Sequence, residues 1–141
     1  MVFVSFLPSG CSTQLQQEAL YHKSADEIGA KGIDVHVEEL KRTERTSLLR
    51  VPHYGKRTAV ESRVAMCLFT DLAIKRGFRY WVNGYPPPDG DHVLLGFLHS
   101  EKLDWRSVLG PEFATQYSDV ADVGALCVMC GCRPDAPPRS Q

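Results

Sequence analysis

The sequence predicts a single α+β domain in which one main helix, at about residues 59–76, packs on a small and mainly antiparallel sheet, with a short second helix. One observation behind this prediction is an amphipathic segment with capping signals at both ends. The other is a set of short segments with strand character that lie before and after it. A chain of 141 residues is long enough to bury one core of its own, so we expect one domain with tails.

The main helix has the clearest boundaries. Thr58 and Glu61 match a capping box, in which the threonine oxygen accepts a backbone N–H of the first turn and the glutamate accepts the N–H of the cap residue. Lys75 and Arg76 suit the negative end of the helix dipole, and Gly77 can adopt the left-handed closing conformation. The apolar face that should pack on the sheet comprises Ala65, Met66, Leu68, Phe69, Leu72 and Ala73, and the opposite polar face comprises Arg63, Thr70, Asp71 and Lys75.

Four segments have the composition of strands. Residues 33–38 alternate apolar and polar side chains, and residues 47–51 form a second candidate that ends at Pro52. After the helix, residues 78–82 are aromatic and β-branched, and residues 93–99 resume an apolar strand beyond a loop of turn-forming residues. The last two segments are therefore expected to pair as a hairpin.

The region after this hairpin is less regular. Residues 103–109 are expected to form the short second helix, capped by Ser100 and stopped by Gly110 and Pro111. Residues 119–132 fit either a strand or a helix.

A cleavage signal of small residues precedes Cys11. Ser9 and Gly10 supply the small side chains that lipoprotein processing requires before a cysteine whose thiol receives lipid, and Ser12 rather than aspartate favours the outer membrane. Residues 1–7 are apolar but short and carry no lysine or arginine, so they have the form of a truncated signal peptide. Acyl chains on Cys11 would hold the protein on a membrane without a spanning helix.

These signals divide the chain into four parts. We expect a truncated signal-peptide-like segment at 1–10, a lipid anchor and tether at 11–32, the α+β globular domain at 33–132 and a disordered tail at 133–141. The protein would then lie at the periplasmic face of a bacterial outer membrane. If the lipidation signal is not used, the chain instead begins with an extended apolar strand and is cytoplasmic.

The segment from Thr70 to Trp81 resembles one that recurs in small, poorly characterised bacterial outer-membrane lipoproteins. In those proteins a helix ends in a triplet like Ala-Glu-Leu, and a few polar residues and Gly-Phe or Gly-Tyr then lead into an aromatic strand. Here Thr70-Asp71-Leu72 occupies the place of the triplet, and Gly77-Phe78 precedes the strand. The resemblance implies an envelope lipoprotein with a small α+β domain, and it carries no catalytic residues.

The cysteines near the C-terminus form a second cluster. Cys127, Cys130 and Cys132 follow a C-x-x-C-x-C pattern, which can hold zinc from one tight turn, but a closed zinc site needs four ligands. The missing ligand would have to be Cys67, His92 or His99. Alternatively, the four cysteines that remain beside a lipidated Cys11 form two disulfides, one of them tying the cluster to Cys67. We favour the structural disulfides and keep zinc as an open alternative. The two histidines are seven residues apart on one predicted strand, so they should face opposite sides of the sheet and are unsuited to a shared ligand role.

Composition narrows the classes of function. The formal net charge is -1 and basic residues are interspersed with acidic ones, so no electrostatic footprint for nucleic acid is present. No arrangement typical of a hydrolase or a phosphate-binding loop is evident, and we expect the protein not to be an enzyme. The sequence thus favours a non-enzymatic envelope lipoprotein with an accessory or interaction role, attached through its lipid and contacting an envelope protein. The alternative is a metal-binding or thiol-redox protein that uses the C-x-x-C-x-C segment.

Overall fold

The computed structural model describes residues 19–84, 90–101, 104–113 and 119–134. Within these residues, six strands form one antiparallel sheet in the order β1-β2-β3-β5-β4-β6. The strands are β1 (His22–Ser24), β2 (His36–Arg42), β3 (Thr46–Arg50), β4 (Tyr80–Gly84), β5 (His92–Leu98) and β6 (Ala121–Asp122). The helices are α1 (Ala59–Arg76), α2 (Trp105–Leu109) and α3 (Val123–Cys130), and the short 3-10 turns are η1 (Ala25–Ile28), η2 (Tyr54–Lys56) and η3 (Pro111–Phe113).

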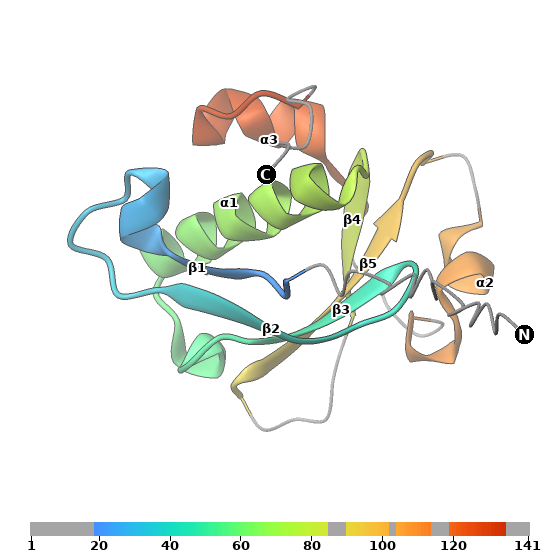
Figure 1. Cartoon of the computed structure of the whole chain (residues 1–141), viewed down its shortest axis with the longest axis horizontal. Coiled ribbons are helices and arrows are strands. Elements are labelled where there is room, and N and C mark those ends of the chain that lie inside the picture. Colours follow the sequence, from blue (N-terminus) through green and yellow to red (C-terminus); the bar gives the residue numbers. More distant parts are fainter. Residues whose placement is uncertain (1–18, 85–89, 102–103, 114–118, 135–141) are drawn as a thin grey trace, which may run out of the picture.

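The layers are visible in Figure 1, where α1 lies on the sheet and α3 lies on the far side of α1. The short helix α2 does not share this layer, because it lies beside β5, away from α1. The α+β fold with one main helix, a small antiparallel sheet and a short second helix is therefore confirmed.

The main helix begins and ends where its capping signals predict. The Thr58 hydroxyl accepts the backbone N–H of Glu61 at 3.2 Å, and the Glu61 carboxylate accepts the backbone N–H of Thr58 at 3.3 Å. At the other end, Gly77 has a φ of 83° and its N–H bonds back to carbonyls of the last turn. These local interactions set the two ends of α1.

Each face of the sheet buries its own apolar cluster. The larger cluster lies between the sheet and α1 and includes the fully buried Phe69 and Leu72. The smaller cluster lies on the opposite face, where α2 and η3 place Leu109 and Phe113 over β4 and β5. Gly96 of β5 makes this second contact close, since a Cβ there would lie 2.4 Å from a Leu109 methyl carbon and 3.0 Å from the Phe113 ring.

The C-terminal end of α1 is fastened to the β2–β3 turn by Arg76. Its guanidinium donates hydrogen bonds to the backbone carbonyls of Thr43 at 2.6 Å, Glu44 at 3.1 Å and Thr46 at 2.8 Å. It also donates to the Ser47 hydroxyl at 2.9 Å. One side chain therefore satisfies several backbone acceptors of the turn.

The N-terminal boundary of the domain differs from the expectation. The expected tether at residues 11–32 is wrong for its later part, because Tyr21 and Ala25 are 6% and 1% exposed and belong to the core beneath α1. This stretch forms β1, which pairs with β2, and η1, which contacts α1. Residues 11–18 lie outside the described residues. The segment is mostly polar, and this composition does not reveal its two buried side chains, Tyr21 just before β1 and Ala25 in η1.

The polar face of α1 also differs from the expectation. Thr70 is fully buried rather than exposed, and its hydroxyl accepts the indole N–H of Trp81 at 3.1 Å while donating to the carbonyl of Met66 at 2.8 Å. Asp71 is half-buried rather than exposed. Helical periodicity could not reveal the burial of Thr70, because Trp81 lies on the neighbouring strand β4.

The C-terminal region resolves the ambiguity at residues 119–132, which contain the short strand β6 followed directly by α3. The short second helix α2 begins at Trp105, with Asp104 rather than Ser100 at its N-cap, and it ends at Gly110 as expected. At this start the Asp104 carboxylate accepts the Ser107 hydroxyl at 2.6 Å, a bond between two side chains of the first turn.

Candidate functional site

Four of the five cysteines meet at α3. Cys67 on α1 is joined by a disulfide to Cys130 at the end of α3, with the two Cα atoms 5.6 Å apart. Cys127 and Cys132 form a second disulfide, with their Cα atoms 4.6 Å apart. The prediction of disulfides is confirmed, and while they persist these sulfurs are not available as thiolate ligands for zinc. Cys11, the expected lipidation residue, lies outside the described residues.

A groove of about 290 Å³ opens beside the Cys67–Cys130 disulfide, between η1, α1 and α3. Its lining is mainly apolar and comprises Ile28, Gly29, Ala30, Arg63, Val64, Cys67, Met129 and Cys130. Next to it, α3 exposes Val128 and Met129, whose exposed fractions are 88% and 53%. Arg63 at this groove is exposed and makes no hydrogen bond or ion pair with another described residue. The arrangement can accommodate an apolar side chain with a negative charge beside it.

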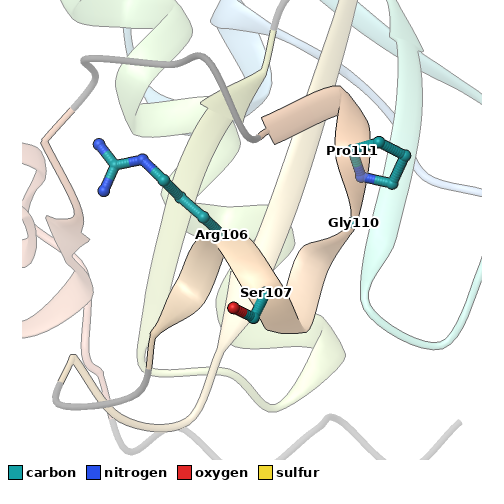
Figure 2. Close-up of a pocket in the computed structure, with 4 residues that line it drawn as sticks. All are labelled: Arg106, Ser107, Gly110 and Pro111. Atoms are coloured by element: carbon teal, nitrogen blue, oxygen red, sulfur yellow. The ribbon is translucent and has the colours of Figure 1, made fainter.

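A second cleft, of about 320 Å³, lies at the turn from α2 to η3 and is lined by Arg106, Ser107, Gly110 and Pro111. Figure 2 shows the Arg106 side chain extending away from Pro111, so its guanidinium does not point toward the residues of the turn. The guanidinium carbon of Arg106 instead lies 4.2 Å from the centroid of the Trp105 ring. This cleft therefore gathers few groups that could act on a ligand.

Asp71 is the centre of one cluster of charged groups, which lies between β1 and α1. Its Oδ2 accepts the Tyr21 hydroxyl at 2.9 Å and lies 3.1 Å from the Lys23 ammonium and 3.3 Å from the Lys75 ammonium. Burial favours the neutral acid, but the hydrogen bonds from Lys23 and Tyr21 and the charge of Lys75 outweigh it and lower the pKa of Asp71. Burial first, and the Asp71 charge second, raise the pKa of Tyr21.

Glu39 is the centre of a second such cluster and is only 2% exposed. Its carboxylate accepts hydrogen bonds from the Arg42 guanidinium, the Ser47 hydroxyl and the backbone N–H of Tyr21. Burial acts to raise the pKa of Glu39, but these hydrogen bonds and the Arg42 charge lower it overall. The carboxylates of Asp71 and Glu39 are thus both held by partners within the fold, which is the arrangement of structural ion pairs.

The histidines considered as zinc ligands lie on opposite faces of the sheet, as the period-2 pattern requires. His92 pairs in register with Arg50 on the face away from α1. The His99 ring stacks on Phe78, with centroids 4.5 Å apart, and Phe78 belongs to the cluster under α1. The geometry therefore does not bring these two histidines together.

A different pair of histidines, which the sequence reasoning did not single out, does come together. The rings of His22 on β1 and His36 on β2 have centroids 6.4 Å apart. The alternation of His36-Val37-Glu38 predicts that His36 lies on the face of the sheet opposite Val37. The position of His22 depends on β1, a strand that the sequence pattern did not predict.

Comparison with known proteins finds no matching family model, no similar curated protein and no similar solved structure. Among the described residues, no three His, Cys, Asp or Glu side chains are already gathered closely enough to hold a metal ion. The helices in this part of the chain include none with the length and apolar character needed to cross a bilayer.

Proposed function

We propose that this chain is a non-enzymatic cell-envelope lipoprotein that binds a segment of another envelope protein in the groove between η1, α1 and α3. The observation that carries the interaction role is the exposed apolar surface of α3 beside this groove. Exposed apolar side chains that cluster at a groove are typical of protein-binding sites, whereas single exposed ones are not. Here Val128 and Met129 are adjacent, and Met129 also lines the groove.

The groove is supported by a covalent frame. The Cys67–Cys130 disulfide fixes the end of α3 against α1, and the Cys127–Cys132 disulfide closes the chain around that end. A site whose walls are fixed before binding loses less conformational entropy when a partner docks. The disulfides therefore favour binding at this face without themselves taking part in chemistry.

Arg63 indicates the chemistry of the partner. Arg63 has no partner among the described residues, and a guanidinium so placed beside an apolar groove favours a segment that carries an apolar side chain next to a carboxylate. Such a charge contributes more to the choice of partner than to raw affinity. We therefore propose an acidic and apolar segment as the ligand.

The envelope location rests on the lipidation signal that ends at Cys11. The test is to express the chain behind a complete leader and to compare it with Cys11→Ser by labelling with palmitate and by membrane fractionation. The unsubstituted protein should be labelled and sediment with outer membranes, and the variant should do neither. Membrane association that persists in Cys11→Ser would overturn the lipoprotein proposal.

The interaction role is tested separately by site-specific photocrosslinking in intact cells. A crosslinking residue at Val128 should give a discrete adduct, whereas one at Ser107, in the cleft of Figure 2, should not. Arg63→Glu should abolish the adduct while leaving the thermal unfolding midpoint unchanged. An adduct formed equally from both positions, or insensitive to Arg63→Glu, would contradict docking at the groove.

The thiol-redox and zinc alternative predicts different chemistry at the same cysteines. Thiol titration and metal analysis of protein purified without reductant separate the two functions. Under the proposed function, thiol reagents modify none of Cys67, Cys127, Cys130 and Cys132, with or without a chelator. Stoichiometric zinc, released together with four reactive thiols on addition of a chelator, would favour the alternative.

A further inference from the structure

The face of the sheet away from α1 carries three potential metal ligands on its first two strands. His22 of β1 lies directly opposite Glu38 of β2, and His36 lies two residues before Glu38 on the same strand. Directly opposite residues of an antiparallel pair point to one face, and so do residues two apart. The intervening Val37 and the following Glu39 are buried on the α1 side, so this trio occupies the other face.

The side chains of His22, His36 and Glu38 make no hydrogen bond or ion pair with another described residue. The charge of His22 contributes to lowering the pKa of the exposed Glu27. The ring contact of 6.4 Å between the histidines is the interaction that links them to each other. The elements α2 and η3 cover β4 and β5 at the other end of this face, so within the described residues the trio is left uncovered.

We propose that His22, His36 and Glu38 form a binding site for a divalent transition-metal ion of the kind that imidazole prefers, represented by Zn²⁺ and Cu²⁺. Two imidazole nitrogens and one carboxylate oxygen are a ligand set that these ions accept, with water completing the coordination. This site goes beyond the proposed function and is independent of the cysteines.

The backbone register is what makes the site feasible. Opposite Cβ atoms in an antiparallel pair lie about 4.5–5.5 Å apart and diagonal ones about 7–8 Å, distances that histidine and glutamate side chains can span. The three groups are not already gathered at ligand distance. The ion therefore assembles the site by drawing together side chains whose backbone positions are fixed by β1 and β2.

Arg50 gives the site a distinguishing property. It lies opposite Glu38 from the β3 side, so its positive charge is close to the proposed ion. Replacing this charge should strengthen metal binding by about tenfold, because the repulsion in water between a divalent ion and one positive charge about 6 Å away is removed. A site elsewhere on the chain would not respond to this change.

The experiment is calorimetric titration of the full chain with ZnCl₂ and, separately, with CuCl₂. The protein keeps its disulfides, and Cys11 is alkylated beforehand because a free thiol would bind the same ions. One ion per chain should bind, with Cu²⁺ tighter than Zn²⁺. His22→Ala and His36→Ala should each weaken binding by about tenfold or more, and Glu38→Gln should weaken it as well.

The matched control is His92→Ala, which removes a histidine from the same face on β5, beyond Arg50, and should leave the affinity unchanged. Thermal unfolding of each variant shows that the fold is retained, and His22→Gln replaces His22→Ala if the alanine variant unfolds. The electron paramagnetic resonance spectrum with Cu²⁺ should indicate two imidazole nitrogens, reduced to one in His36→Ala. Absence of binding, or affinity that is unchanged in folded His22 and His36 variants, would overturn the site.

Discussion

The hydroxyl of Tyr21 donates a 2.9 Å hydrogen bond to Oδ2 of Asp71, across 50 residues of sequence, and so ties the segment before β1 to the middle of α1. The same carboxylate oxygen contacts two lysines, Lys23 and Lys75. One acidic side chain thus joins the N-terminal strand to the main helix. This junction explains why the domain begins before residue 33, although the preceding segment is mostly polar.

We predict that Asp71→Ala lowers the free energy of unfolding by about 1–3 kcal/mol, because it leaves the buried Tyr21 hydroxyl without its carboxylate acceptor. Urea denaturation followed by circular dichroism measures the change. Asp34→Ala is the matched control, since Asp34 is exposed and has no partner among the described residues. Equal stability of the two variants would show that the Tyr21–Asp71 contact is not stabilising.

Stability should also fall in acid. The folded-state pKa values of Glu39 and Asp71 lie below their ordinary values, so both carboxylates stabilise the fold above about pH 4 and lose that contribution as the pH falls through the lowered pKa values. The urea midpoint should therefore decrease between about pH 5 and about pH 3. The urea midpoint of Glu39→Gln should decrease less over this interval, because the variant has one fewer carboxylate to protonate. An unchanged pH dependence in that variant would contradict the role of Glu39.

The two disulfides should contribute unequally. Cys67 and Cys130 are 63 residues apart and Cys127 and Cys132 only 5, so the first bridge restricts the unfolded chain more. Replacing the first pair by alanine should cost about 4 kcal/mol and replacing the second about 2 kcal/mol, on the loop-entropy estimate. Denaturation without reductant measures both. The reverse order would show that packing around the buried Cys127 outweighs loop entropy.

Gly96→Ala should displace α2 and η3 from the sheet, because its Cβ would lie within 2.4 Å of a Leu109 carbon. We expect a loss of about 1–3 kcal/mol, as for other overpacked contacts. Leu109→Ala makes room for the new methyl group, so the double variant should lose less than the sum of the two single losses. Additive losses, measured by urea denaturation, would place the two residues out of contact.

Local signals in the sequence predicted α1 well, because Thr58, Glu61 and Gly77 act on backbone groups within one turn of themselves. The β4–β5 hairpin was likewise predictable from its strand composition and the intervening turn residues. Pairing of cysteines was foreseen as one of two alternatives, but the particular partners depended on where α3 packs.

Other features depend on contacts that no local pattern encodes. Thr70 looks like a surface residue in helical periodicity, and only the position of the Trp81 indole explains its burial. The juxtaposition of His22 and His36 requires the register of a three-residue edge strand. The groove at α3 likewise arises from three elements whose relative placement is a tertiary property.

The attachment of Arg76 to the β2–β3 turn has a consequence for how the molecule opens. A single guanidinium satisfies carbonyls of the turn from the last residue of α1, so the turn cannot separate from the helix without exposing several acceptors at once. Fraying of this hairpin and fraying of the helix end are therefore one event. In amide exchange with solvent, the two should behave as a single cooperative unit and share one opening free energy.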